Sequence, residues 1–493
     1  MNKFLAFLGF DPEKKKTTVR TEIIAGIVTF LAMAYILTLN PMLMLNLFDD
    51  PTYGYLYPSV FVATAIGAFI GTLLMALYAK LPLAQAPGLG LNSMVGFLLG
   101  GTLVSGYNLS FGNAMLLVLI SGLLFFLLSI VKIKGNSIRM IIYKAIPESI
   151  RKAISIGIGL FIAFIGLAGA GIITVGNDTL VGLVQFSKWD MAANGPALVC
   201  LFGFIVIAVL SHFNIKGAVI IGIAAATLFG LIPGIGVTQW SGQTWAFWEY
   251  FANFFSFDPS KGGTFFAAFT EGFVFPQGTP IMSLVMVVIT FCMIDMFDTM
   301  GTCVGCCSAA GLMTEDGVPV NYERIMIADS TATAAGALLG TSTVTTFVES
   351  GAGISAGGKT GLTALVTAVL FFLSIFLLPV FASIPGAAAN AALIWVGCLM
   401  LKGVKDVKID SVKDFVPSFL TIAMMPLGYS ITTGIGFGIL SYVVIDLCGY
   451  LFGLLAYALS KKEDKTKPVW DLHVVTIIIA VLFIVYFFVP TSF

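Results

Sequence analysis

The sequence predicts an all-α polytopic membrane protein with about fourteen transmembrane segments in two inverted repeats of seven spans. Three observations point to this fold class. Hydrophobic residues occupy 58% of the 493 positions and charged residues 10%, and the mean hydropathy is +1.01. Apolar runs close to the roughly 20 residues that cross a bilayer recur along the chain. Glycines interrupt two expected spans at corresponding places in the two halves. This composition excludes a soluble globular protein.

The clearest apolar runs give the positions of individual spans. They are Ile24–Leu39, Val60–Leu77, Met115–Ile130, Ala197–Leu210, Leu284–Cys307, Leu362–Leu378 and Gly436–Leu451. A further run at 474–489 either crosses the membrane as an additional segment or packs on its surface. The sequence leaves these two alternatives open.

Lys and Arg residues give the expected orientation of the spans. They concentrate in residues 14–20, 132–152, 402–413 and 461–467, and short loops rich in these residues stay in the cytoplasm. Our span count places an even number of crossings between successive basic segments, so the topology is consistent. The first 20 residues are charged and do not fit a cleavable signal. We expect a multi-pass protein of the plasma (inner) membrane with a cytoplasmic N-terminus.

An aromatic-rich, non-basic segment divides the chain at residues 234–280, and we expect it outside the cell. Each half then runs through the same odd number of spans. The second half therefore enters the membrane from the opposite side, as in an inverted-topology repeat.

The interrupted spans are the best indication of a binding site. Their sequences are AQAPGLGLNSMVG at Ala84–Gly96 and TSTVTTFVESGAG at Thr341–Gly353, and both are too short to cross as unbroken helices. Paired broken spans are typical of transporter sites, because the freed backbone groups must face protein or a water-filled cavity. The alternative interpretation is that these glycines only allow helices to pack closely, and it accounts well for Gly67–Gly71. This interpretation accounts poorly for the β-branched TSTVTT, because that sequence is typical of a strand.

Acidic residues at membrane depth are costly to bury and are therefore candidates for function. Five qualify: Asp295, Asp298, Asp329, Glu349 and Asp446. Asp295 and Asp298 lie on one helix face, where burial would let one of them hold a proton at neutral pH. We favour a site role for Asp298 and leave Asp295 open between the site and a hydrogen bond to a neighbouring helix. Asp329 either supports the site or makes a structural hydrogen bond, and Asp446 is not assigned.

Glu349 and two further residues complete the candidate site. Glu349 follows the strand-like stretch where a half-helix would begin, so its carboxylate either accepts N–H groups of a planar ligand or caps that helix. Phe347, two residues earlier, either stacks on the ligand or packs in the core. Asn92 follows PGLGL in the other broken span, and its amide both donates and accepts hydrogen bonds. A bridge between two helices is the alternative for Asn92.

Other chemistries find no support. His212 and His473 lie at span ends, which argues against a histidine proton relay, and no HExxH motif occurs. The cysteines of CVGCC at Cys303–Cys307 lack further ligands nearby, so we expect no metal and no cofactor. No catalytic residue and no nucleic-acid partner are expected.

Four stretches together resemble a known family. They are TFLAMAYILTLNP (Thr29–Pro41), APGLGLNSMVGF (Ala86–Phe97), DMFDTMGT (Asp295–Thr302) and TSTVTTFVESGAGISAGGKTGLTALVTA (Thr341–Ala368). Over nearly its whole length the chain resembles the nucleobase/cation symporters of the nucleobase/ascorbate transporter fold. Within them it is similar to the azaguanine-type permeases for hypoxanthine, guanine or adenine.

The resemblance implies a division into domains. Core-domain spans would occupy residues 21–135 (spans 1–4) and 281–384 (spans 8–11), and gate-domain spans 136–233 (spans 5–7) and 385–459 (spans 12–14). Residues 1–20 would form the N-terminus and residues 460–493 a tail with the final apolar segment. Short strands would lie in spans 3 and 10, and a homodimer and elevator-like movement would follow from the fold.

The resemblance also assigns roles by position. The span-8 acid of the family falls on Asp298, the span-10 acid on Glu349, the polar span-3 position on Asn92 and the aromatic residue on Phe347. Many uracil and xanthine members have a His four residues after the span-8 acid, and here that position is Thr302. This departure fits the purine branch and puts a histidine-based coupling step in doubt.

The resulting hypothesis is proton-coupled import of a purine base, with Asp298 and Glu349 in coupling and Asp295, Thr302 and Asp329 near the site. An anion or pyrimidine carrier of the same fold is the alternative, and a channel or sensing receptor is the alternative from another class. The sequence does not show which purine is preferred or whether the coupling ion is H⁺ or Na⁺.

Overall fold

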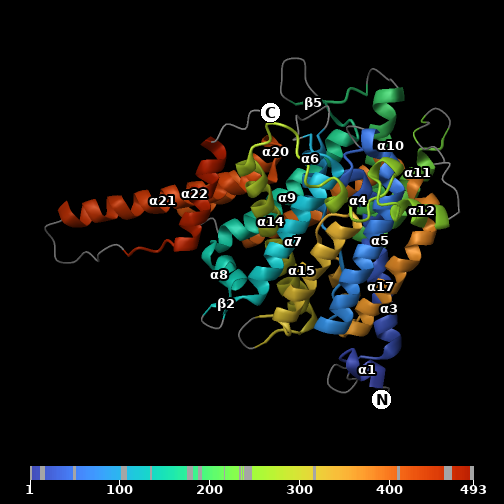
Figure 1. The fold of residues 1–493 in the computed structure, drawn as a ribbon, viewed down its shortest axis with the longest axis horizontal. Coiled ribbons are helices and arrows are strands. Elements are labelled where there is room, and N and C mark those ends of the chain that lie inside the picture. The colour runs from blue at the N-terminus through green and yellow to red at the C-terminus, as the bar shows by residue number, and fades with distance from the viewer. Residues whose placement is uncertain are drawn as a thin grey trace.

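A computed structural model describes residues 3–10, 17–47, 51–100, 108–133, 136–174, 181–186, 191–215, 217–232, 235, 237, 247–314, 318–407, 411–459 and 469–488. Most of these residues are helical (Figure 1). The predicted basic segment 461–467 and part of the predicted outer segment, residues 238–246, lie outside this description.

The first half of the chain contains helices α1 and α3 to α13. Their bounds are α1 Lys3–Phe7, α3 Val19–Met33, α4 Ile36–Met44, α5 Tyr57–Leu74, α6 Leu89–Leu99, α7 Phe111–Ile130, α8 Ile138–Ala145, α9 Glu148–Gly169, α10 Met191–His212, α11 Ala218–Phe229, α12 Phe247–Phe254 and α13 Ala267–Thr270.

The second half contains α14 to α22. Their bounds are α14 Ile281–Ala310, α15 Tyr322–Leu339, α16 Ser350–Ser355, α17 Gly361–Leu373, α18 Leu378–Ala382, α19 Gly386–Met400, α20 Val412–Leu427, α21 Ile431–Leu459 and α22 Val474–Phe488. Short 3₁₀ segments are η1 Pro51–Leu56, η3 Pro259–Lys261, η4 Ser374–Leu377 and η5 Leu401–Asp406, and η2 Met75–Ala79 is a π-helical turn.

The all-α polytopic fold predicted from the sequence is confirmed. In the described ranges, 9 helical segments are long and apolar enough to cross a membrane. Three more, α6, α11 and α22, are apolar but shorter. The final apolar run is the helix α22, which packs on α21.

Short strands occur where the broken spans were predicted. β1 (Gln85–Pro87) pairs antiparallel with β6 (Val344–Thr346), with Gln85 opposite Thr346. Each strand leads into a half-helix, α6 after β1 and α16 after β6. The order long helix, strand, half-helix, long helix therefore occurs once in each half of the chain. Two further pairs lie in connections: β2 (Lys132–Ile133) with β3 (Asn136–Ser137), and β4 (Ile173–Thr174) with β5 (Gly182–Leu183).

The strand pair is enclosed by protein. Every residue of Thr341–Thr346 is buried, and hydroxyl groups satisfy backbone groups next to the pair. The Thr72 hydroxyl accepts from the Gln85 amide and donates to its carbonyl, each at 2.9 Å. The Ser350 hydroxyl accepts from the backbone of Ala84 at 3.0 Å. Irregular backbone at membrane depth requires such partners, because lipid offers none.

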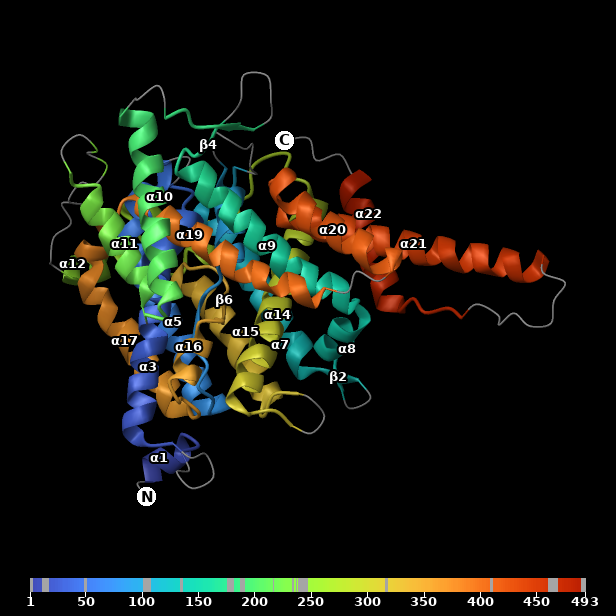
Figure 2. The ribbon, with the colours of Figure 1, turned by 180° about the vertical axis from the view of Figure 1, so that it is seen from behind.

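The long helices pack in two sets, and the strands β1 and β6 lie against the first (Figure 2). In one set, α7 packs on α14 and α15, and α17 packs on α3 and α5. In the other, α9 packs on α19 and α20, and α10 packs on α11 and α19. Contacts of α9 with α6 and α14 join the two sets.

Helix α21 differs from the other long helices. It projects from the body of the molecule in both views (Figures 1 and 2), and only 6% of its most apolar window is buried, against 33–67% for the other long apolar segments. It packs on α20, and Lys413 of α20 forms an ion pair with Asp446 of α21. Asp446, which the sequence left unassigned, therefore has a structural partner.

The segment predicted as an outer loop, residues 234–280, is partly helical. It contains α12 and α13, which pack on α5 and α7. Phe251 and Phe254 belong to a run of aromatic contacts that continues through Phe265. Some of the aromatic residues of this segment, such as Tyr250 and Phe254, thus bury apolar surface against the bundle, whereas Trp248, Phe257 and Phe273 are exposed.

A buried carboxylate ties the first span to the start of α17. Glu22 on α3 accepts hydrogen bonds from the backbone of Lys359 at 3.0 Å and Thr360 at 3.2 Å, and from the Thr363 hydroxyl at 2.5 Å. A carboxylate at a helix N-terminus satisfies free N–H groups and the positive end of the helix dipole. Nearby, the backbone of Gly361 donates to the carbonyl of Leu8 at 3.1 Å.

The half-helix α6 requires a residue without a side chain where it meets α4. A Cβ at Gly96 would lie 2.3 Å from the carbonyl oxygen of Leu43, whereas a Cβ at Gly305 on α14 would have nothing within 4 Å. We expect Gly96→Ala to lower the free energy of unfolding by about 1–3 kcal/mol, because backbone atoms must move. Gly305→Ala should leave it unchanged or raise it, since alanine favours helix. Thermal unfolding of both purified variants checks this, and equal melting temperatures would contradict the assigned contact.

Candidate substrate site

Glu349 lies at the start of the half-helix α16, as predicted. It occupies the N-cap position, yet its side chain makes no capping hydrogen bond. The carboxylate instead accepts a hydrogen bond of 2.5 Å from the hydroxyl of Tyr35, at the break between α3 and α4. Tyr35 is buried, whereas Glu349 is partly exposed. The carboxylate is therefore oriented by a residue of the first span and remains accessible on one side.

Asp298 faces the same region from α14. It is partly exposed and interacts electrostatically with Glu349, and Tyr35 interacts with both acids. In the described part of the chain we find no hydrogen bond to the Asp298 side chain. Two acids of the second repeat thus approach one another beside a tyrosine hydroxyl of the first repeat.

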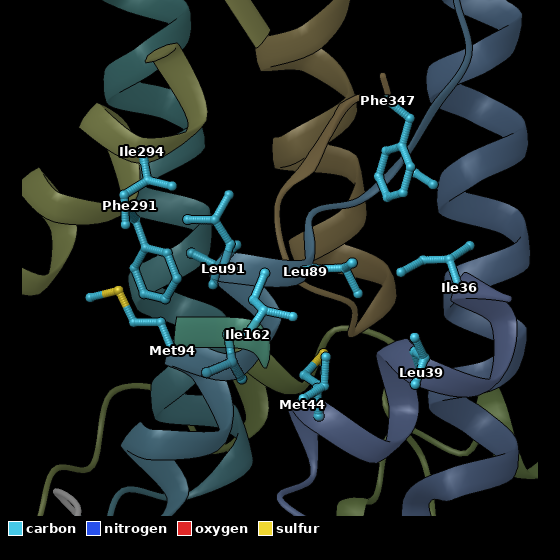
Figure 3. Close-up of a cluster of buried hydrophobic side chains, with 14 of the residues drawn as sticks. Ile36, Leu39, Met44, Leu89, Leu91, Met94, Ile162, Phe291, Ile294 and Phe347 are labelled. Carbon is cyan, nitrogen blue, oxygen red and sulfur yellow. The ribbon is translucent and has the colours of Figure 1, made fainter. Parts of the chain in front are cut away.

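Phe347 belongs to the main buried hydrophobic cluster. Figure 3 shows its ring in an apolar environment that also includes Ile36 of α4 and Leu89 of α6. Its backbone N–H donates to the carbonyl of Ala84 at 3.0 Å, next to the strand pair. The side chain is 7% exposed, so the ring is close to the surface of this cluster. Its predicted stacking on a ligand stays a prediction.

Asn92 is fully buried on α6 and joins the two broken spans. Its Oδ1 accepts a hydrogen bond from the hydroxyl of Ser342, just before β6, and its Nδ2 donates to the carbonyl of Pro87 at 3.4 Å. Asn92 therefore bridges the two broken spans, which corresponds to the alternative interpretation of this residue as a bridge between two helices. Direct contact of Asn92 with a substrate stays a prediction.

Asp295 and Asp329 lie behind the strand pair. Asp295 accepts from the Thr333 hydroxyl at 2.9 Å. Asp329 accepts from Gln85 Nε2 and from the Thr299 hydroxyl, each at 2.8 Å. Both acids are fully buried. Although Asp295 and Asp298 are close on one helix, Asp295 bonds to α15 and Asp298 interacts with Glu349.

Thr302 lies one turn beyond Asp298 on α14 and is 6% exposed. Its position is compatible with the predicted place near the site. Among the described residues, no group of three or more His, Cys, Asp or Glu side chains is arranged to hold a metal ion.

The sequence interpretation missed three residues of this region. Tyr35 stands in the stretch TFLAMAYILTLNP, where a hydroxyl among apolar residues was a usable signal. Gln85 opens the first broken span and bonds to Asp329. Thr299 shares a hydrogen bond of 2.6 Å with Thr345 of β6. Their partners lie far away in the sequence, so spacing alone could not identify them.

The arrangement suits a small, planar, polar ligand. Glu349 offers acceptor oxygens, the neighbouring apolar side chains offer a surface for a flat ring, and Asp298 offers a second ionisable group. Acids at membrane depth are found mainly where ions, protons or polar substrates pass.

A family model described as the permease family matches residues 20–437 of this chain. The chain belongs to this permease family. The permease is therefore a membrane transporter and not an enzyme, as the sequence predicted. The match runs from α3 to the start of α21.

Curated relatives agree with this assignment. A putative permease of Methanocaldococcus jannaschii is 38% identical over 89% of this chain and 92% of its own length. The guanine/hypoxanthine permease PbuO of Bacillus subtilis is 36% identical over 97% and 100%. The adenine permease AdeQ of Escherichia coli is 36% identical over 88% of each chain. The resemblance to the purine branch of the nucleobase/cation symporters is confirmed.

Solved structures support the fold alone. The structure of SLC26A9 has a TM-score of 0.58 at 12% identity and covers 90% of this chain and 67% of that one. The transmembrane domain of the cyanobacterial bicarbonate transporter BicA has a TM-score of 0.56 at 13% identity, with 85% and 97% covered.

The contacts of Gln85 lead to a test of the region behind the strands. Gln85→Leu keeps the volume but removes the donor to Asp329, so a buried acceptor loses one of its two partners. We expect a loss of about 1–3 kcal/mol in the free energy of unfolding. Gln277→Leu, at an exposed position, is the control and should be neutral. Denaturation of both purified variants measures the difference, and a stable Gln85→Leu protein would contradict a structural role for this bond.

Proposed function

We propose that this permease imports purine nucleobases, namely hypoxanthine or guanine and also adenine, by proton symport. The observation that carries the proposal is the pair of carboxyl groups, Glu349 oriented by Tyr35 and Asp298 facing it. The names of the relatives support the substrate class, since they include guanine/hypoxanthine and adenine permeases.

Binding of the base rests on Glu349. A purine presents N–H donors on the edge of a flat ring, and a carboxylate can accept two such bonds side by side. Phe347 would stack on the ring. Asn92, already bonded to Ser342, would complete the polar edge directly or by holding the backbone of the broken span in place.

Coupling to protons follows from the two acids. Two carboxylates that face one another in a site surrounded by protein repel, so uptake of one proton relieves that repulsion. Asp298, for which the described chain offers no hydrogen-bond donor, would take the proton, and Glu349 would stay charged to bind the base. The choice of H⁺ over Na⁺ rests on the family resemblance.

Alternating access would come from relative movement of the two helix sets. The set containing α3, α5, α7, α14, α15 and α17 carries the strands and Glu349, and would move as the core domain. The set containing α9, α10, α11, α19 and α20 would be the gate domain, through which two copies would form a homodimer. We propose that the protein lies in the plasma (inner) membrane with its N-terminus in the cytoplasm.

An anion carrier is the second candidate, because SLC26A9 and the bicarbonate transporter BicA share the fold. Their identity to this chain is too low to transfer a substrate. Acidic residues in the site also repel an anion. A pyrimidine carrier would bind a ligand of chemistry similar to that of a purine. Competition by unlabelled uracil in the first test distinguishes it from a purine carrier.

Replacing Glu349 tests the binding role. We expect Glu349→Gln to abolish uptake of radiolabelled hypoxanthine in cells that lack their own purine carriers, because the amide loses one acceptor position and the charge. Uptake by the unmodified protein should fall with a protonophore and with unlabelled guanine or adenine, and should persist with uracil or sulfate. Glu323→Gln, at an exposed ion pair with Lys132, is the matched control. Normal uptake by Glu349→Gln at normal membrane abundance would remove the site assignment.

Replacing Tyr35 tests the orientation of the carboxylate. Tyr35→Phe removes a hydrogen bond to a charged group, which is typically worth about 1.5–3 kcal/mol. We expect the hypoxanthine concentration for half-maximal uptake to rise roughly tenfold or more. Tyr57→Phe is the control, since the buried Tyr57 hydroxyl donates to the Phe381 carbonyl at 3.4 Å, away from Glu349. Equal effects of the two changes would mean that Tyr35 has no special role.

A further inference from the structure

A buried arginine interacts electrostatically with the acids behind the strand pair. Arg139, on α8, is 1% exposed. Its guanidinium stacks over the ring of Phe125 at 4.3 Å, and its Nη1 lies 3.5 Å from the Ser129 hydroxyl. Within the described chain, its Nε and Nη2 have no hydrogen-bond partner. A charged group is thus enclosed by protein with most of its donors unused.

The acids nearby have unused acceptors. Asp295 Oδ1 and Asp329 Oδ2 are buried without a hydrogen-bond partner among the described residues. Arg139 interacts electrostatically with both acids, and the two acids interact with each other. Arg139 also interacts with Cys292, one turn before Asp295 on α14. The arginine therefore faces the side of α14 that carries Asp295.

A guanidinium cannot lose its charge at any ordinary pH, so its burial requires a nearby negative charge. The charged or titratable groups that interact electrostatically with the two acids are Arg139, Asp298, Cys292 and Cys303. Among these, Arg139 is the cation. Asp298 is partly exposed and also interacts with Glu349. Asp295 and Asp329 are then the acids that can balance the arginine.

We propose that Arg139 is the internal counter-ion of Asp295 and Asp329 and a positioning residue for transport. It acts through Asp329, which accepts from Gln85 of β1 and from Thr299. Thr299 in turn is bonded to Thr345 of β6. A charged carboxylate accepts stronger hydrogen bonds than a neutral one. Arg139 therefore favours the charged form of Asp329, whose carboxyl group connects the two strands, without touching the substrate.

A double-mutant cycle on the purified full-length protein tests the charge balance without any substrate. Arg139→Met keeps the apolar stem but leaves two buried acids without a cation, and we expect the melting temperature to fall by about 5 °C or more. Adding Asp295→Asn or Asp329→Asn should return part of that loss, because one excess negative charge is removed. Arg139→Lys should lose less than Arg139→Met.

The control for loss of a stacked cation is Arg324→Met. Arg324 lies 5.8 Å from the ring of Tyr78 at an exposed position, and its change should leave the melting temperature within about 1 °C. Strictly additive losses in the double variants would overturn the proposal. Such additivity would mean that Arg139 contributes packing over Phe125 and no charge balance.

Transport kinetics separate positioning from binding. If hypoxanthine is transported, Arg139→Lys should lower the maximal rate at least about tenfold while the half-saturating concentration changes less than about threefold, since the substrate-facing groups are intact. A change confined to the half-saturating concentration would contradict a positioning role. Failure of hypoxanthine transport by the unmodified protein affects only the proposed function, because the stability cycle does not depend on it.

Discussion

The backbone of β1 and β6 imposes the main constraint on this molecule. Six residues in the two strands leave the helix pattern inside a membrane protein, where lipid cannot accept or donate hydrogen bonds. The two strands satisfy one another, and threonine and serine hydroxyls satisfy the groups at their edges. Because the strands come from different halves of the chain, neither half is complete without the other.

This constraint explains the chemistry around α14. Toward the half-helix α16, Asp298 and Glu349 keep partial exposure. Asp329, fully enclosed by protein, bonds to Gln85 and Thr299 and interacts electrostatically with Arg139. The two groups of acids therefore differ in burial, although Asp298 interacts electrostatically with both buried acids. The glycines at Gly71 and Gly336 let α5 and α15 pack closely on Val344 of β6.

The sequence predicted the fold class and the broken spans because these features are local. The β-branched run before Glu349 indicated a strand, and the glycines after it indicated a new helix start. The partners of these residues were not predictable in the same way. Tyr35 and Glu349 are 314 residues apart, and Gln85 and Asp329 are 244 apart. Asn92 was predicted as a ligand group from its amide, its place in the broken span and the family resemblance, with a bridge between helices as the alternative. Its burial and its bond to Ser342 depend on how the repeats meet. The helices α12 and α13 were missed because a short aromatic run has no clear period.

The bond of Glu22 to the start of α17 has a consequence for synthesis of the chain. Glu22 leaves the ribosome 337 residues before Lys359, its backbone partner, and β1 likewise precedes β6. During that interval the Glu22 carboxylate and the pairing edge of β1 lack the partners that the second half supplies. Contacts of such large sequence separation form late. A nascent chain stopped before Thr346 therefore contains the whole first repeat while these groups still lack their partners.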